Sequence, residues 1–266
     1  MERSHRGPLV IQRPFYPEGD PCHVYLVHPP GGVVGGDELR IDAQVDPGAH
    51  ALITTPAATK FYRCDGRVSS QTQELHAAGA TLECLPQENI FYRGADARTA
   101  TRVQLDSHSR FIGWEIACLG LPARGEHFDA GTLRLDFELW RAPSPLEPVN
   151  LLTDPVRRSE PAVPVFVDRL RLAGTSPARG AAWGLAGQEA VGTLLATPAA
   201  RDHVESIREL LVDMPYCAVS LVDGVLVLRA LAPQAEAVRT LFIAAWRRLR
   251  PGIVGRAAVL PRIWST

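Results

Sequence analysis

The sequence predicts a mainly β protein of stacked, β-helix-like sheets, a single domain over residues 1–266 with two α-helices in its last third. Three observations carry this prediction. Apolar residues alternate with polar ones along much of the chain, turn signals follow at short intervals, and one β segment occurs twice. Alternation at period two is typical of half-buried strands, and a repeated β unit indicates coils that stack on one another.

Two segments show the alternation most clearly. "ELRIDAQV" (38–45) and "TLRLDFELW" (132–140) each place an apolar side chain at every second position. Turn signals such as Asp46-Pro47-Gly48 and Asp223-Gly224 separate the strands. This close spacing favours consecutive strands over β-α-β units.

The internal repeat pairs "GAHALITTPAATKFYR" (48–63) with "GATLECLPQENIFYR" (79–93). The leading glycines lie 31 positions apart, whereas the two Phe-Tyr-Arg endings lie 30 apart, so the second copy is one residue shorter. Two copies of this size predict successive coils of a solenoid. Coincidence between two similar strand-turn units is the alternative.

Two helices are predicted near the end of the chain. In residues 201–214 the apolar side chains share one face, Asp202 can cap the start, and Pro215 stops the helix. The second helix begins near Pro233, and Pro251 is expected to end it. Both apolar stripes predict packing against the sheets.

Composition limits the possible functions. The chain has 28 basic and 29 acidic residues, a net charge of −1, so no overall charge attracts it to nucleic acid or an anionic membrane. Five scattered cysteines, with no signal-like start and no membrane-length apolar run, indicate a cytoplasmic protein. After Glu236 every charged residue is an arginine, which suits either a solvated helix end or a docking patch for an acidic partner.

The segment "HPPGGVVGGD" (28–37) combines two prolines with four glycines. It has the glycine spacing of a phosphate-binding loop, but Asp37 stands where that loop needs lysine, and a strand follows instead of a helix. We therefore predict a close-packed backbone crossing. Its candidate structural residues are His28, Gly31, Gly32, Gly35 and Gly36.

No hydrolase motif is present, and the histidines and cysteines lack the paired spacing of a structural metal site. A β-rich metal-dependent hydrolase with scattered ligands stays open as an alternative. Lys60 is the only lysine of the chain, which otherwise uses arginine. This position could therefore require the compact charge of an ammonium group in place of a planar guanidinium. With Arg63 in the same segment, it is a candidate binding or structural residue.

Four carboxylates lie beside aromatic or glycine-rich β segments. Glu115 is the most unusual, because "FIGWEIACL" is otherwise apolar and a buried carboxylate is costly unless it is paired or hydrated. It therefore either pairs with a basic residue in the core or lines a polar cavity. The four candidates are Asp37, Glu88, Glu115 and Glu126.

Six segments together resemble the UreD family of urease accessory proteins, called UreH in some organisms. They are "HPPGGVVGGD", "TTPAATKFYR", "LPQENIFYRGA", "GWEIACLGLPARGEHF", "VGTLLATP" and "VLPRIWST", and they occur in the family's order. The resemblance implies a helix-like stack of β-strands with two helices. It also implies additional strands ahead of "GPLVIQRPFYPEG", which this sequence reaches at Gly7, so either the start is assigned late or a strand pair is missing.

The resemblance further implies a non-catalytic scaffold for urease maturation. Such a scaffold binds apo-urease and recruits UreF and the GTPase UreG, and the assembly installs nickel and a lysine carbamate. The four carboxylates would then attract transient Ni2+ along an internal polar passage, with no tightly bound cofactor. Arg262 and Trp264 are the interface candidates. A plain structural subunit of the same complex is a third possibility.

Overall fold

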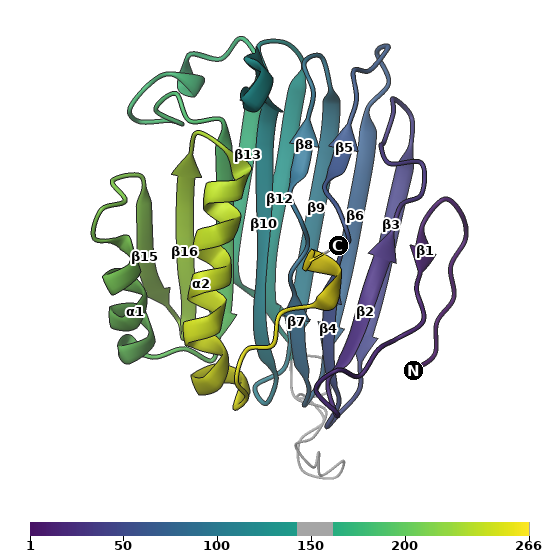
Figure 1. The fold of residues 1–266 in the computed structure, drawn as a ribbon, viewed down its shortest axis with the longest axis vertical. Helices are drawn as coiled ribbons and strands as arrows, with labels where there is room; N and C mark the ends of the chain where they lie inside the picture. The colour runs from purple at the N-terminus through teal and green to yellow at the C-terminus, as the bar shows by residue number, and fades with distance from the viewer. Residues whose placement is uncertain (143–161, 266) are drawn as a thin grey trace.

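The computed structural model describes residues 1–142 and 162–265. Two large β-sheets face each other, and both helices lie on the outer face of one of them (Figure 1). Sheet I is the helix-covered sheet, and sheet II has no helix on its outer face in the described residues. This arrangement confirms the predicted class of a mainly β, stacked-coil fold with two helices.

Sheet I has 11 strands in the described residues, with β1, β2, β4, β7, β10, β14, β16 and β15 in spatial order and β5, β8 and β11 joined to this path. Their bounds are β1 Val10–Ile11, β2 Cys22–Val27, β4 His50–Thr54, β5 Thr59–Phe61, β7 Thr81–Cys84, β8 Asn89–Phe91, β10 Arg110–Leu121, β11 Glu126–His127, β14 Ala190–Thr197, β15 Cys217–Val222 and β16 Val225–Ala232.

Sheet II has five strands in the described residues, in the order β13, β12, β9, β6, β3. Their bounds are β3 Glu38–Val45, β6 Ser69–Ala77, β9 Asp96–Leu105, β12 Thr132–Arg141 and β13 Val163–Ala173. The chain alternates between the sheets from β2 to β12, so parallel strands stack in successive coils. The alternating segments 38–45 and 132–140 are strands as predicted.

The internal repeat is a real structural repeat. β4 pairs with β7 in a register that joins Ile53 to Cys84, an offset of 31 residues. β5 pairs with β8 in a register that joins Phe61 to Phe91, an offset of 30, and the two rings stack with centroids 4.8 Å apart. The residue missing from the second copy is therefore lost in the break between β7 and β8.

The two helices are α1 (Arg201–Arg208) and α2 (Ala235–Val254), and short 3-10 turns are η1 (Pro122–Arg124), η3 (Pro177–Arg179), η4 (Glu209–Leu211) and η5 (Arg262–Ser265). α1 is shorter than predicted because its last turn tightens into η4. Asp202 is not its cap: the Ala200 N–H donates to His203 Nδ1 at 3.1 Å, and Ala200 is the N-cap residue.

Pro251 does not end α2. The helix continues through it to Val254 and stops at Gly255, whose φ of 79° is left-handed. The last turn persists because Ile253 and Val254 are buried in the core. A proline removes one hydrogen bond from a helix, and here the burial of this turn offsets that loss.

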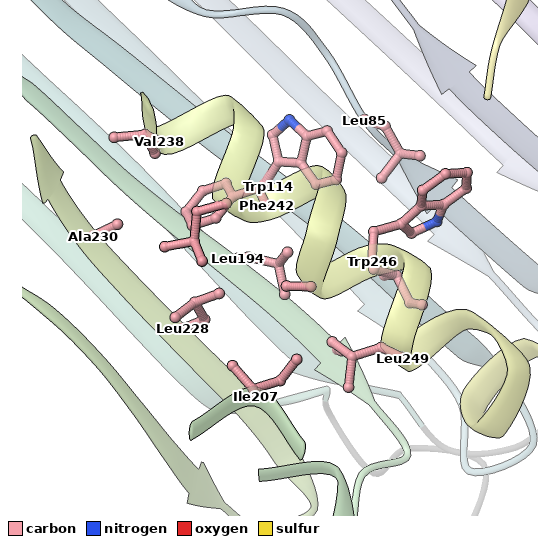
Figure 2. Close-up of a cluster of buried hydrophobic side chains, with 14 of the residues drawn as sticks. Leu85, Trp114, Leu194, Ile207, Leu228, Ala230, Val238, Phe242, Trp246 and Leu249 are labelled. Carbon is pink, nitrogen blue, oxygen red and sulfur yellow. The ribbon is translucent and has the colours of Figure 1, made fainter. Parts of the chain in front are cut away.

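The helices cover sheet I with an apolar core. Figure 2 shows Phe242, Trp246 and Leu249 of α2 pointing toward Trp114 and Leu194 on the sheet. All five side chains are almost completely buried. Trp114 also donates to the Pro86 carbonyl at 2.8 Å, which satisfies its only polar atom.

The space between the sheets is different, because its apolar side chains divide into two clusters. One cluster surrounds Phe111 and Phe137, and the other surrounds Phe61, Phe91 and Phe128. Between them, the inward positions of several strands carry polar residues. This polar band is where the candidate functional site lies.

Candidate functional site

The polar band on sheet II follows one row of the strand register. Gln73 of β6 pairs with Thr101 of β9, Thr101 with Phe137 of β12, and Phe137 with Asp168 of β13. Gln73 Nε2 donates to Thr101 Oγ1 at 3.0 Å. This row of paired residues therefore crosses sheet II and ends with the carboxylate of Asp168 on the edge strand β13.

The facing row on sheet I joins three further polar residues. Glu115 of β10 pairs with Thr193 of β14, and Thr193 pairs with Arg229 of β16. Glu115 forms a side-chain hydrogen bond with Thr101, so the two rows meet across the gap between the sheets. Near the open edge, Thr193 Oγ1 donates to Asp168 Oδ2 at 3.0 Å, which is a second link.

Glu115 stands between two pockets. A pocket of about 340 Å³ extends from it toward β13, β15 and β16, and a pocket of about 260 Å³ extends toward β2, β3 and β4. Both are lined by Asn89, Glu115 and Ile116. We call them the β13 pocket and the β3 pocket. Glu115 thus lies where the two pockets meet.

The β3 pocket in turn adjoins a cleft of about 1070 Å³ at the N-terminal edge of the sheets, with which it shares Leu9, Leu26, Leu39, Ile41 and Ile53. Hollow spaces therefore follow one another from one edge of the sheets to the other. Their polar lining includes five residues of the polar band: Gln73, Glu115, Asp168, Thr193 and Arg229.

The environment of Glu115 favours its protonated form. Its pKa is raised to about 7: burial between the sheets is the main cause, the bond with Thr101 opposes the shift, and the nearby charges of Asp168 and Asp136 add to it. No basic side chain is salt-bridged to Glu115 among the described residues. Of the two options left by the sequence, pairing in the core or facing a polar cavity, the structure shows the second.

The other three predicted carboxylates do not line these two pockets. Asp37 accepts the Val34 N–H at 3.0 Å and closes the turn before β3. Glu126 is exposed on β11. Glu88 lies in the break after β7, and its Oε2 is buried without a hydrogen-bond partner in the described residues. The structure thus brings only Glu115 of the four to the polar band.

The glycine segment carries the chain from β2 in sheet I to β3 in sheet II as a close crossing. A Cβ on Gly32 would lie 2.1 Å from the Tyr62 ring, and one on Gly35 would lie 3.0 Å from the Arg67 carbonyl oxygen. Gly31 and Gly36 have φ of 73° and 90°. Any larger residue would collide or be strained at these points.

His28 opens the same crossing and lines the β3 pocket with Gly31 and Lys60. Its Nδ1 is buried and has no partner in the described residues. Burial lowers the pKa of His28, and the charge of Asp37 partly opposes this. The Lys60 carbonyl accepts the Val33 N–H at 2.7 Å. The Arg63 side chain is exposed and passes close to Gly94.

The two interface candidates have different surroundings. Arg262 is exposed in η5. Trp264 packs inward against Trp114 and Trp246, with ring centroids 6.1 and 6.2 Å away, and its Nε1 donates to Thr54 Oγ1 at 3.0 Å. The Trp264 side chain therefore anchors the C-terminal segment to the helix-side core.

The arginines at the end of the chain are largely occupied within the protein. Arg248 pairs with Glu209 at 2.8 Å and Arg256 with Asp20 at 3.1 Å. Arg250 is completely buried and bonded to two carboxylates. These three charges make contacts within the protein, and neither a solvated helix end nor a docking patch describes the buried Arg250.

Thr101, Asp168, Thr193 and Arg229 were not found from the sequence. A signal for Asp168 is present: in "VFVDRLRLA" it occupies the same alternating phase as Phe166, Leu170 and Leu172. A carboxylate in the apolar phase of a strand is unusual. Its partner Thr193 lies 25 residues further along the chain.

Comparison with known proteins agrees with the resemblance of these segments. The family model described as UreD urease accessory protein matches residues 1–265. The chain belongs to the UreD family of urease accessory proteins. The resemblance of the six segments is thereby confirmed.

Relatives named urease accessory protein UreD cover almost the whole chain. One from Alkalilimnicola ehrlichii is 44% identical over 100% of this chain and 86% of its own length. One from Pseudomonas putida is 41% identical over 99% of this chain and 87% of its own. One from Klebsiella pneumoniae is 42% identical over 99% of this chain and 89% of its own.

UreD relatives are named as accessory proteins, and nothing supports the alternative of a metal-dependent hydrolase. In residues 1–142 and 162–265 no group of three or more His, Cys, Asp or Glu side chains could hold a metal ion. In the same part of the chain, no helix has the length and apolar character to span a bilayer.

Proposed function

We propose that this UreD protein is a non-catalytic scaffold that conducts Ni2+ between its sheets, past Glu115, during urease maturation. The nickel ion is cargo and is not held tightly. Glu115 carries the proposal, because it is a carboxylate placed between two pockets and is not balanced by a basic group in the described residues.

The physical argument concerns the strength of binding. A cation passes a protein only where its binding is favourable enough for entry and weak enough for release. One carboxylate surrounded by hydroxyl and amide groups meets this requirement, whereas three or four convergent ligands would trap the ion. With a pKa of about 7, Glu115 can also exchange a proton for the cation near neutral pH.

The proposed partners are apo-urease, UreF and the GTPase UreG, and the proposed location is the cytoplasm. The family membership supports this proposal, since UreD relatives are named for their accessory role toward urease. The β13 pocket and the N-terminal cleft lie toward two different edges of the sheets, which supports a passage with two ends. A scaffold that receives nickel from one partner and delivers it to another needs two separate openings.

The test is urease activity and bound nickel in cells that carry the urease operon with this gene deleted and then restored. Glu115→Gln removes the charge and keeps the size of the side chain. We expect it to lower activation at limiting nickel about tenfold, the effect of weakening cation binding by about 1.4 kcal/mol. Excess nickel should restore most of the activity.

Glu126→Gln is the matched control, because it removes an exposed carboxylate outside the pockets. It should activate urease like the native protein. If Glu115→Gln also does so at limiting nickel, conduction past Glu115 is wrong. If the deletion itself changes nothing, the maturation role of this chain is wrong as well.

A further inference from the structure

The outer end of the β13 pocket carries a pair of opposite charges that the passage itself does not explain. The charged residues that line this pocket are Glu115, Asp168, Arg169 and Arg229. Arg169 turns to the outer face of sheet II, where its guanidinium bonds Glu138 at 2.9 Å. Asp168 and Arg229 remain at the opening.

Arg229 holds Asp168 across the gap between the two sheets. Its Nε lies 3.3 Å from Asp168 Oδ2, and its guanidinium lies over the Phe166 ring, 5.5 Å from the centroid. Thr193 donates to the same Asp168 oxygen. The guanidinium therefore neutralises the one carboxylate, besides Glu115, that lines this pocket.

We propose that Arg229 is an electrostatic gate, which closes the outer end of the β13 pocket to divalent cations by pairing with Asp168. This inference rests on the proposed conduction past Glu115. A fixed positive charge repels an approaching cation, and Arg229 Nε also lies against Asp168 Oδ2, an oxygen that would bind that cation. Asp168 becomes a cation ligand only when the guanidinium moves away.

The gate can open at small cost. About half of the Arg229 side chain is exposed, at 54%, and 31% of Asp168 is exposed, so water and salt screen the pair. Exposed pairs of this kind contribute little to stability. The buried Arg250, with 0% exposed, has no such freedom. Arg229 thus excludes metal without fixing the closed state permanently.

The test measures binding of Co2+ and Ni2+ to the purified full chain by calorimetry at pH 7.5. Removing the guanidinium with Arg229→Gln should tighten binding about tenfold, since it frees Asp168 and removes the repulsion. Arg171→Gln is the matched control. Arg171 also lies on the edge of the molecule and pairs with a carboxylate, Asp136, but it does not line the pocket.

The double variant Asp168→Asn, Arg229→Gln separates the gate from a general charge effect. Its affinity should return to the native value, because the freed ligand is gone. The proposed gate is refuted if the metal affinity of Arg229→Gln stays within twofold of the native value, or if Arg171→Gln binds metal as tightly as Arg229→Gln. An unfolding midpoint like that of the native protein shows that each variant is folded.

The two proposals fail separately. Loss of urease activation in Glu115→Gln, together with native metal affinity in Arg229→Gln, would refute the gate and keep the passage. Native activation in Glu115→Gln would refute conduction past Glu115, whatever the affinity of Arg229→Gln.

Discussion

The two faces of sheet I surround a strand carboxylate in opposite ways, the completely buried Glu83 on one face and the half-buried Glu115 on the other. On the helix side, Glu83 of β7 bonds Trp246 Nε1 at 2.6 Å, His50 Nε2 at 2.7 Å and Arg250 at 3.0 Å. On the side facing sheet II, Glu115 has a hydroxyl partner, Thr101. The two residues lie on adjacent strands of the same sheet, because β7 pairs directly with β10.

The pKa directions express the same difference. Burial by itself would raise the pKa of Glu83, but the bond with His50 and the charge of Arg250 outweigh it, so the pKa is lowered. The pKa of Glu115 is raised to about 7 because burial prevails there. A carboxylate whose charge is compensated by basic partners stabilises the contact between the elements that carry them. A carboxylate without such partners lowers the stability of the fold, and such destabilisation is typical of functional sites.

The hydrogen-bonded group around Glu83 and Arg250, on the helix side of sheet I, also joins distant parts of the chain. Arg250 of α2 bonds Glu83 and, at 2.6 Å, Glu18 near the N-terminus. Glu18 is in turn bonded to His23 at 2.8 Å. The cluster therefore connects the start of the chain, a solenoid coil and the last helix.

The largest expected effect is the loss of the buried guanidinium. Arg250→Met should lower the free energy of unfolding by about 3–5 kcal/mol at pH 7, because it leaves Glu18 and Glu83 without their shared cation. Urea unfolding followed by circular dichroism measures it. Arg248→Met, which removes a partly exposed pair with Glu209, should cost less than about 1 kcal/mol. Equal costs for the two variants would contradict the comparison.

The second effect appears in the pH dependence of stability. The pKa of Glu115 rises from about 4.3 in the unfolded chain to about 7 in the fold. The folded state then binds more protons between these values, so this residue lowers stability as pH increases from about 4.3 to 7. Glu115→Gln should remove that contribution, and its stability relative to native should increase by up to about 3 kcal/mol across this range.

Urea unfolding at pH 5, 6, 7 and 8 measures this slope, with Glu126→Gln as the exposed control. Glu83 should act in the opposite direction. Since its pKa is lowered, its stabilisation is present above the unfolded value and is lost as the solution becomes acidic. A difference between native and Glu115→Gln that does not change with pH would show that Glu115 is ionised and compensated like Glu83.

The smallest effect sharpens the comparison by removing one hydrogen-bond donor from each carboxylate. Trp246→Phe takes a donor from the ionised Glu83 and should cost about 1.5–3 kcal/mol in urea unfolding. Thr101→Val takes the donor from Glu115 and should cost less than about 1 kcal/mol at pH 6, where that carboxylate is largely protonated. It should also raise the pKa of Glu115 further, which infrared spectroscopy of the carboxyl band can follow. A larger cost for Thr101→Val would reverse the argument.

The sequence by itself determined the fold class, the repeat and the family. Alternation in residues 38–45 and the paired segments 48–63 and 79–93 record which side chains face inward, and strand geometry converts that pattern directly into coils. The sequence did not predict the end of α2, because the burial of Ile253 and Val254 allows the helix to continue past Pro251. Such packing is not encoded in local propensity.

Only the tertiary structure decided which carboxylate is compensated by a basic partner and which is not. Glu83 and Glu115 are both acidic residues in apolar strands, and nothing near them in the sequence tells them apart. Their difference depends on the face of sheet I that each occupies and on partners far along the chain, Arg250 for one and Thr101 for the other. Asp168 and Arg229 meet from opposite sheets, 61 residues apart. The sequence records the alternation along each strand, whereas the register and facing of the sheets bring these charges together.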